Sequence, residues 1–207
     1  MKVYSAAQIR NLGLFGHGSA GKTSIVEALL FTAGAIPRMG KIEDGTTTTD
    51  HDPDEIRHKM TISVGLAPLE WRDHKINLVD APGYADFFGE VAEAMRIIDC
   101  ALIVVEAVSG VQVGTVAAWN EADSHSAPRM VFVNKMEREN ADYGKVLEQL
   151  RQRWGVGVIP LTVPIGAEHE FKGVIDLARF QAFLDDKKGP EAVPADLADS
   201  VAAYREM

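Results

Sequence analysis

The sequence predicts an α/β fold in which helices cover both faces of a mostly parallel β-sheet. Short apolar runs of strand length alternate along the chain with longer stretches whose apolar residues recur at helical spacing. In addition, a glycine-rich loop, Gly16 to Thr23, joins the first apolar run to the first helical stretch.

The expected strands before residue 155 are residues 9–16, 61–71, 75–79, 101–105 and 130–133. The second and third are separated by a short R-D-H turn, which favours an antiparallel hairpin. The expected helices are residues 23–32, 85–98, 113–125 and 140–154. Residues 39–59 are polar, threonine-rich and acidic, so we expect a long mobile loop there, with the D-H-D-P-D-E run solvated.

The alternation of strand-like and helix-like stretches changes after Gly155. We therefore place a boundary there, between residues 1–155 and residues 156–207. The second part contains short apolar runs that indicate further β-strands. D-D-K-K-G-P-E, which begins at residue 185, is interpreted as a turn, and residues 195–207 as the start of a helix.

Composition excludes several functional classes. The net charge of −9 argues against a nucleic-acid-binding patch, which is usually basic. The single cysteine, Cys100, leaves no partner for an intramolecular disulfide, and the six histidines lack the spacing of a metal site. No apolar stretch approaches membrane-spanning length and the N-terminus lacks the apolar core of a signal peptide, so we expect a cytoplasmic protein without a membrane partner.

G-H-G-S-A-G-K-T, from Gly16 to Thr23, matches the phosphate-loop pattern G-x-x-x-x-G-K-[ST]. A chance match is expected in about one chain in a hundred of this length, and the predicted strand and helix on either side make chance a weaker explanation. Backbone N–H groups of such a loop point at phosphate oxygens, and the helix N-terminus adds its dipole. Lys22 is expected to reach the β- and γ-phosphates of a nucleotide, and the Thr23 hydroxyl to bind Mg²⁺. The predicted nucleotide-binding residues here are Gly16, His17, Gly18, Ser19, Ala20, Gly21, Lys22, Thr23 and Ser24.

Two further segments complete a nucleotide-site pattern. D-A-P-G follows the third expected strand, so that Asp80 is predicted to hold a magnesium-bound water and Gly83 to contact the γ-phosphate. N-K-M-E follows the strand at residues 130–133 and offers Asn134, Lys135 and Glu137 for reading the nucleobase. Taken alone, the first segment is an ordinary turn and the second a solvated helix start. Their order after the phosphate loop favours the functional interpretation.

These elements together resemble translational GTPases, most closely elongation factor G and its paralogues. D-A-P-G-Y-A-D-F-F-G-E-V is similar to the family's D-T-P-G-H-x-D-F-x-x-E-V, and G-V-Q-V-G-T to its G-V-Q-x-Q-T. I-G-A-E-H-E-F-K-G-V-I-D-L resembles the opening of the insert subdomain of elongation factor G. The G-T-T-T-T-D stretch is also similar to ribosomal-protection factors of the tetracycline-resistance type.

The resemblance implies a P-loop GTPase G domain in residues 1–155, with its sheet incomplete at the C-terminal end, followed by the start of an α+β insert in residues 156–207. It implies GTP and GDP as ligands, Mg²⁺ as cofactor, and the ribosome as partner of a full-length factor. It also implies a switch threonine that binds Mg²⁺, for which Thr61 is the match. Residues 46–49 are the competing candidates, and we interpret them as a solvated loop.

The residues that differ from the family pattern lie at positions expected to take part in hydrolysis and nucleotide binding. Tyr84 replaces the histidine that positions the attacking water, which makes Tyr84, Lys22 and Gly83 the expected catalytic residues. Gly18 replaces an apolar gate residue and leaves room for the tyrosine ring. Ser19 stands where many members have an aspartate linked to a monovalent cation, Lys59 replaces a switch glycine, and Glu137 replaces the guanine-reading aspartate.

Three functions remain open from the sequence. The first is a GTPase that the ribosome activates. The second is a switch that binds GTP without hydrolysing it, which Tyr84 and Glu137 favour. The third is a nucleotide site with weakened discrimination against ATP, although the carboxylate retained at Glu137 favours guanine.

Overall fold

The computed structural model describes residues 2–184 and 189–207 and divides into two compact units. Unit 1 comprises Met1–Val105 and Gln112–Phe132, and unit 2 comprises Glu106–Val111 and Val133–Met207. The predicted boundary at residue 155 is a different division and stays a prediction. Residues 185–188 of the predicted turn lie outside the described residues.

A five-stranded sheet has the order β2-β3-β1-β4-β5. Its strands are β1 (Ile9–Gly16), β2 (Gly65–Trp71), β3 (His74–Asp80), β4 (Cys100–Glu106) and β5 (Arg129–Asn134). Strand β1 pairs in parallel with both β3 and β4, whereas β2 and β3 form an antiparallel hairpin. Arg72 and Asp73 both adopt positive φ at the hairpin turn, as the tight turns of twisted hairpins require. The mostly parallel sheet and the hairpin are therefore confirmed.

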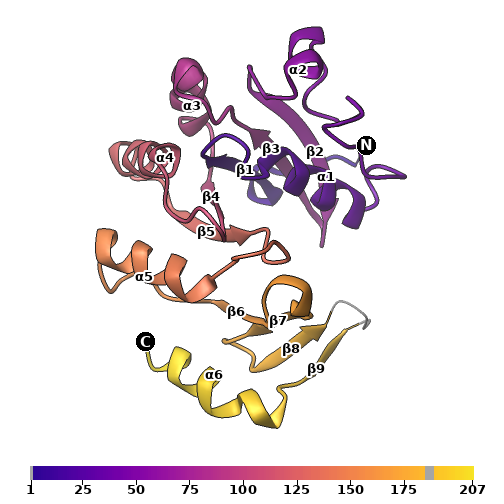
Figure 1. Ribbon diagram of the computed structural model, residues 1–207. Helices are drawn as coiled ribbons and strands as arrows, with labels where there is room; N and C mark the ends of the chain where they lie inside the picture. Colours follow the sequence, from indigo (N-terminus) through magenta and orange to yellow (C-terminus); the bar gives the residue numbers. More distant parts are fainter. Residues whose placement is uncertain (1, 185–188) are drawn as a thin grey trace. The chain divides into compact units, whose positions relative to one another are not determined.

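Alternation along β1 directs side chains to two apolar clusters, one on each face of the sheet. Leu14 packs with Val26 and Leu30 of α1 (Lys22–Thr32). Phe15 packs on the other face with residues of α3 (Phe88–Met95) and α4 (Val113–Ser124), and Figure 1 shows α3 and α4 together on one side of the sheet. Because β1 is buried on both faces, the phosphate loop that follows it begins from a rigid position.

Two predicted elements differ in extent. Residues 85–98 form a 3₁₀ turn, Ala85–Phe87, followed by α3, instead of one continuous helix. Strand β2 begins at Gly65 and not at residue 61, because backbone N–H groups before it bond to carboxylates. Ile62 and Ser63 donate to Glu55, and Val64 donates to Glu90.

The expectation of an irregular loop at residues 39–59 is wrong in part, because α2 (Pro53–His58) lies within it. Asp52 caps this helix by accepting from the Asp54 N–H, and Pro53 occupies the first turn. Asp50 and Glu55 are buried whereas residues 51–54 are exposed, so the D-H-D-P-D-E run is solvated only in part. The sequence D-P-D-E is a helix-start signal, and this signal could have revealed α2.

Unit 2 contains α5 (Tyr143–Trp154), a second sheet and α6 (Ala198–Arg205). The second sheet is antiparallel and has the order β6-β7-β8-β9, formed by Thr162–Ile165, Gly173–Asp176, Gln181–Leu184 and Pro190–Ala192. Single-turn 3₁₀ helices are Ala6–Gln8, Glu168–Glu170 and Ala195–Leu197. The short strands and the C-terminal helix agree with the sequence prediction.

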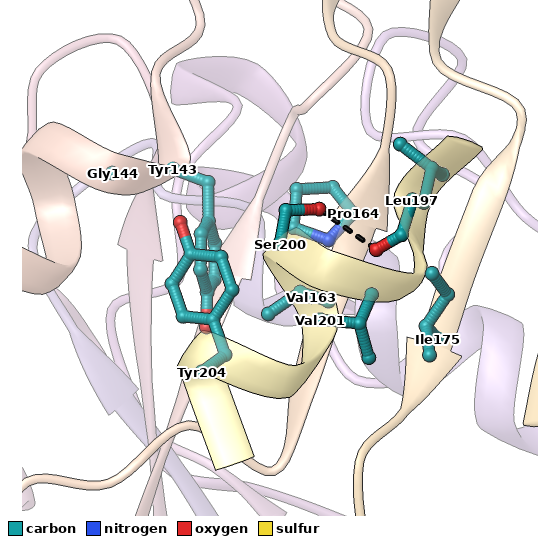
Figure 2. Close-up of a pocket in the computed structure, with 9 residues that line it drawn as sticks. All are labelled: Tyr143, Gly144, Val163, Pro164, Ile175, Leu197, Ser200, Val201 and Tyr204. Atoms are coloured by element: carbon teal, nitrogen blue, oxygen red, sulfur yellow. Dashed lines mark hydrogen bonds between the residues drawn. The ribbon is translucent and has the colours of Figure 1, made fainter. Parts of the chain in front are cut away.

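A pocket in unit 2 lies between α6, the start of α5 and strands β6 and β7 (Figure 2). Tyr143, Val163, Ile175, Val201 and Tyr204 make its lining mainly apolar, and no lining side chain is charged. This pocket therefore offers no cationic side chain to a phosphate. In the part of the chain that the structure describes, no helix is both long enough and apolar enough to span a membrane.

Candidate nucleotide-binding site

The phosphate loop connects β1 with α1, and its backbone depends on glycine at both ends. Gly16 and Gly21 have φ angles of 136° and 101°, in the region that residues with a Cβ rarely adopt. A Cβ on Gly16 would also collide with the carbonyl oxygen of Val104. Gly21 is the N-cap of α1, so the loop ends directly at the positive end of the helix.

Lys22 extends its ammonium group back under this loop. The residue is only 5% exposed, and its Nζ donates to the carbonyl oxygens of His17 at 3.1 Å and Gly16 at 3.4 Å. Burial lowers the pKa of Lys22, and the nearby charges of Asp80 and Asp50 oppose that shift. A buried cation whose hydrogen-bond partners are neutral carbonyl groups would be stabilised by an anionic phosphate bound beside it.

Gly83 brings the D-A-P-G segment against the phosphate loop. A Cβ on Gly83 would lie 2.6 Å from the Gly18 nitrogen and closer still to the Lys22 Nζ. Only glycine permits this approach, because any side chain here would displace the lysine or the loop. The structure therefore brings together Lys22, Gly18 and Gly83, which the sequence assigned to phosphate binding from separate motifs.

Four oxygen-bearing side chains gather where α1, β3 and the residue 39–64 segment meet. The hydroxyl oxygens of Thr23 and Thr61 lie 3.1 Å apart, and the Thr49 hydroxyl donates to Asp80 Oδ2 at 2.9 Å. Asp80 is fully buried, and burial raises its pKa to about 6, although bonds from Thr23 and Thr49 and the charge of Lys22 counter the shift. Thr23, Thr61 and Asp80 were predicted here, and the structure places them in one cluster.

The burial of three residues at or near this cluster, Thr47, Thr49 and Asp50, was not expected from the sequence. Thr49 is 3% exposed and Thr47 is 8% exposed, so the interpretation of residues 46–49 as a solvated loop is wrong for these two. Asp50 is 4% exposed, and burial raises its pKa, partly offset by a hydrogen bond from Thr61. No local pattern marks these residues, because their burial results from contacts with β3 and α1 that are distant in sequence.

The cluster fits a magnesium ion. Oδ1 of Asp80 and Oδ1 of Asp50 are both buried without a hydrogen-bond partner. Each oxygen can therefore still accept a hydrogen bond or bind a cation. Mg²⁺ prefers oxygen ligands and usually binds through one or two carboxylates, waters and substrate phosphates. Among the described residues, no group of three or more histidine, cysteine, aspartate or glutamate side chains is arranged to hold a metal.

Three buried or half-buried carboxylates hold residues 39–64 in place. Glu27 of α1 is 1% exposed and accepts from the N–H groups of Gly40 and Thr48, both at 2.6 Å. Glu55 accepts from Ile62 and Ser63, and Glu90 of α3 accepts from Val64 at 2.8 Å. These bonds fix the backbone on both sides of Thr49 and Thr61, so that the two hydroxyls face the cluster.

The Tyr84 ring lies over the phosphate loop. A Cβ on Gly18 would come within 2.7 to 2.9 Å of three ring carbons of Tyr84, so the ring occupies the volume that a larger residue at position 18 would need. The Tyr84 hydroxyl is 3.5 Å from Ser19 Oγ, and the residue is 37% exposed. Gly18 therefore accommodates Tyr84, as the paired departures in the sequence led us to expect.

The predicted base-reading residues lie in unit 2. Met136 is buried with Ala107 and Ala141, whereas Glu137 on its C-terminal side is exposed. The Lys135 Nζ donates to Glu106 Oε1 at 3.0 Å. Met136 thus anchors the segment, and Glu137 beside it stays at the surface.

The chain as a whole is similar to known proteins. The model of the elongation factor Tu GTP-binding domain matches residues 7–196. The chain belongs to this family. Elongation factor G of Granulibacter bethesdensis (strain ATCC BAA-1260 / CGDNIH1) is 38% identical to the chain over 212 aligned positions.

The solved structure of ttk003000868 from Thermus thermophilus superposes with a TM-score of 0.90 and is 40% identical, covering 97% of the chain and 30% of its own length. The chain spans 31% of the length of the Granulibacter elongation factor G, with all of its own residues matched. These similarities confirm the resemblance to translational GTPases and the P-loop GTPase fold of the G domain.

Asp80 is expected to destabilise the chain when neither nucleotide nor metal is bound. Its folded-state pKa of about 6 exceeds the ordinary value of 3.8, so its protonation favours folding below pH 4 and this contribution is lost as the pH rises through 6. Asp80→Asn should therefore raise the free energy of unfolding at pH 7.5 by up to about 3 kcal/mol, with little effect at pH 4. Denaturant titrations at the two pH values measure this, with the exposed Asp86→Asn as control. Equal destabilisation of Asp80→Asn at both pH values would contradict the assignment.

Glu27→Gln should loosen residues 39–50 while the sheet stays folded. The glutamine amide offers one acceptor where the carboxylate offers two, so one buried N–H is left facing a donor at a cost of about 1–3 kcal/mol. We expect the Thr48 and Gly40 amides to exchange with solvent at least about tenfold faster, measured by NMR against the Leu14 amide of β1. Glu43→Gln, an exposed change in the same segment, is the matched control. Unchanged Thr48 exchange would show that Glu27 does not hold the segment.

Proposed function

We propose that the chain is the GTP-binding part of an elongation-factor-G-like translational GTPase that hydrolyses GTP to GDP. In the full-length factor, the ribosome accelerates hydrolysis, and the energy serves translocation or a related ribosomal step. The observation that carries the proposal is the approach of Gly83 to Gly18 and the Lys22 ammonium, because it forms a cradle that senses a terminal phosphate. Family membership and the similarity to elongation factor G support it.

Each residue of the cradle has a role that follows from its chemistry. The amides of the phosphate loop and the Lys22 ammonium hold the β- and γ-phosphates, and the Gly83 N–H contacts the γ-phosphate. Thr23 and Thr61 would offer hydroxyl ligands to Mg²⁺, and the unpartnered oxygens of Asp80 and Asp50 could accept hydrogen bonds from water bound to it. When bound, the ion neutralises charge that develops on the transferred phosphoryl group.

Tyr84 is proposed to orient the attacking water. A phenol is a much weaker base than the imidazole of histidine, so its contribution is a positioned hydroxyl rather than proton removal. Packing of the ring on Gly18 and the contact with Ser19 restrict where that hydroxyl can point. Lys22 would stabilise the negative charge of the transition state.

Asn134, Lys135 and Glu137 are proposed to select guanine. The Glu137 carboxylate would accept hydrogen bonds from the N1–H and the 2-amino group, which adenine does not present together. Glu137 is exposed, and the buried Met136 beside it keeps the backbone in place. We therefore expect GTP and GDP to bind in preference to ATP, despite the methylene that glutamate adds.

A second candidate is a switch that binds GTP with little or no hydrolysis. The contact between the Tyr84 hydroxyl and Ser19 favours it, because a hydroxyl engaged with the phosphate loop has less freedom to bind water. In that case the signal would be nucleotide occupancy, transmitted through residues 39–64.

Substitutions at Tyr84 separate the two candidates. If the tyrosine is a working variant, Tyr84→Phe should lower the single-turnover rate of GTP hydrolysis about tenfold or more, because the ring remains and only the hydroxyl is lost. Tyr84→His should leave the ribosome-stimulated rate unchanged or reduce it. Rapid-quench measurements with and without ribosomes give both rates, and binding of GDP serves as a control for an intact site. A tenfold or greater increase with Tyr84→His would instead show that the native chain is impaired in hydrolysis.

A further inference from the structure

We infer that Thr49 positions the carboxylate of Asp80 toward a bound metal ion, and that Gly65 provides the space in which Thr49 lies. The sequence motifs of the nucleotide site assign no role to Thr49 or to Gly65. Both residues belong to unit 1, as Asp80 does. The inference rests on the proposed binding of a guanine nucleotide with Mg²⁺, and it adds two residues that act on the ion indirectly.

The contact between Thr49 and Asp80 is shielded from solvent. The Thr49 hydroxyl donates to Oδ2 of Asp80 at 2.9 Å. Thr49 is 3% exposed and Asp80 is 0% exposed, so solvent water does not compete for this bond. The other carboxylate oxygen, Oδ1, is buried without a hydrogen-bond partner. The bond from Thr49 therefore selects which oxygen is satisfied within the protein and which one stays available to an ion or its bound water.

Thr23 is a second hydroxyl that bonds to Asp80. Its hydroxyl is also an expected ligand of Mg²⁺, so it is not free to hold the carboxylate once the ion is bound. Thr49 is the remaining hydroxyl partner of Asp80 among the described residues. Thr49 is therefore the residue that can keep the carboxylate oriented both with and without the ion.

Gly65 leaves the space that Thr49 fills. It is the first residue of β2, and it lies directly opposite Asp80 in the antiparallel pair of β2 and β3. Side chains of directly opposite residues lie on the same face of a sheet, so a side chain at position 65 would stand beside the Asp80 carboxylate. A Cβ on Gly65 would lie 2.6 Å from the Cβ of Thr49 and 2.9 Å from its Cγ2. Thr49 can reach Asp80 in this way because residue 65 is glycine.

The backbone around Thr49 is also held in place. The preceding N–H, that of Thr48, donates to Oε1 of Glu27 at 2.6 Å. The carbonyl oxygen of Thr49 lies 3.0 Å from Nδ1 of His51. In addition, the β-branched side chain of threonine restricts rotation about its first torsion angle. The direction of the Thr49 hydroxyl is thus set before any ligand binds.

An oriented carboxylate binds a metal ion better than one that must be ordered first. Hydrogen-bond partners of metal-binding carboxylates fix their orientation, and removing such a partner costs about 10- to 100-fold in metal affinity. Thr49 acts through Asp80 and has no proposed contact with the phosphates. Loss of its hydroxyl should therefore weaken Mg²⁺ binding much more than it weakens nucleotide binding without metal.

The test is equilibrium binding of fluorescent GDPNP, a non-hydrolysable analogue of GTP, to the 207-residue chain over a range of Mg²⁺ concentrations and in excess EDTA. Thr49→Val keeps the shape without the hydroxyl, and it should raise the Mg²⁺ concentration at half-maximal effect about tenfold. Affinity in EDTA should be unchanged, which also shows that the variant is folded. Thr49→Ser restores a hydroxyl and should bind Mg²⁺ more tightly than Thr49→Val. Thr48→Val, at the exposed neighbouring position, is the matched control and should resemble the wild type.

Substitution of Gly65 tests the space that holds Thr49. Gly65→Ala should displace Thr49 and raise the required Mg²⁺ concentration as Thr49→Val does. The two changes combined should cause little more loss than the larger single change, because they remove the same hydrogen bond. Gly89→Ala is the matched control, because a Cβ on Gly89 would meet no atom within 4 Å.

Four results would overturn the inference. These are an unchanged Mg²⁺ requirement in Thr49→Val, equal losses of GDPNP affinity with Mg²⁺ and in EDTA, a Thr49→Ser variant as weak as Thr49→Val, or additive losses in the combined variant with Gly65→Ala. Wild-type binding that did not depend on Mg²⁺ would also reject it. If the wild-type chain bound no GDPNP at any Mg²⁺ concentration, the proposed function would fail, and the role of Thr49 with it. Mg²⁺-dependent wild-type binding with an unaffected Thr49→Val variant would reject this inference alone.

Discussion

Lys22 carries its ammonium into the interior of unit 1, where the residue is 5% exposed and backbone carbonyls of the phosphate loop are its hydrogen-bond partners. Burial lowers its pKa and raises the pKa of Asp80 to about 6, so both groups are held where their charged forms are costly. An anionic phosphate and a divalent cation would relieve both costs together. The glycines that surround Lys22, above all Gly83, are required because they leave this space open. These buried charges thus lower the stability of the free chain and raise its affinity for a charged ligand.

Residues 39–64 present Thr49 and Thr61 to this site because carboxylates on the surrounding elements bond their backbone. Glu27 on α1 and Glu90 on α3 accept N–H groups at opposite ends of the segment, and Glu55 does so from within it. Few apolar side chains of the segment are buried, so its position depends on these bonds more than on packing. A segment held in this way can respond to the nucleotide without disturbing the sheet.

Local patterns in the sequence predicted the phosphate loop, β1 and the β2–β3 hairpin, since strand, loop and helix signals are adjacent there. The joint position of Lys22 and Gly83 followed instead from the order of two separate motifs. The pairing of Gly18 with Tyr84 was also foreseen, because two unusual residues depart from the family in complementary ways. Burial of Asp50 and Thr49 was missed, because it depends on bonds to other elements, such as that from Thr48 to Glu27 and that from Thr49 to Asp80. The start of β2 was misplaced because the N–H groups of residues 62–64 bond to the carboxylates of Glu55 and Glu90. The roles of Tyr84 and Glu137 in hydrolysis and base choice stay predictions, because they concern a bound nucleotide.

The central claim is that the cradle around Lys22 binds a guanine nucleotide with Mg²⁺. Calorimetric titration of the chain with GTP and Mg²⁺, followed by displacement with GDP or ATP, tests it most directly. The account predicts saturable binding of one GTP per chain, displacement by GDP, little displacement by ATP, and loss of binding in Lys22→Ala. Absence of GTP binding, or equal displacement by ATP and GDP, would contradict it.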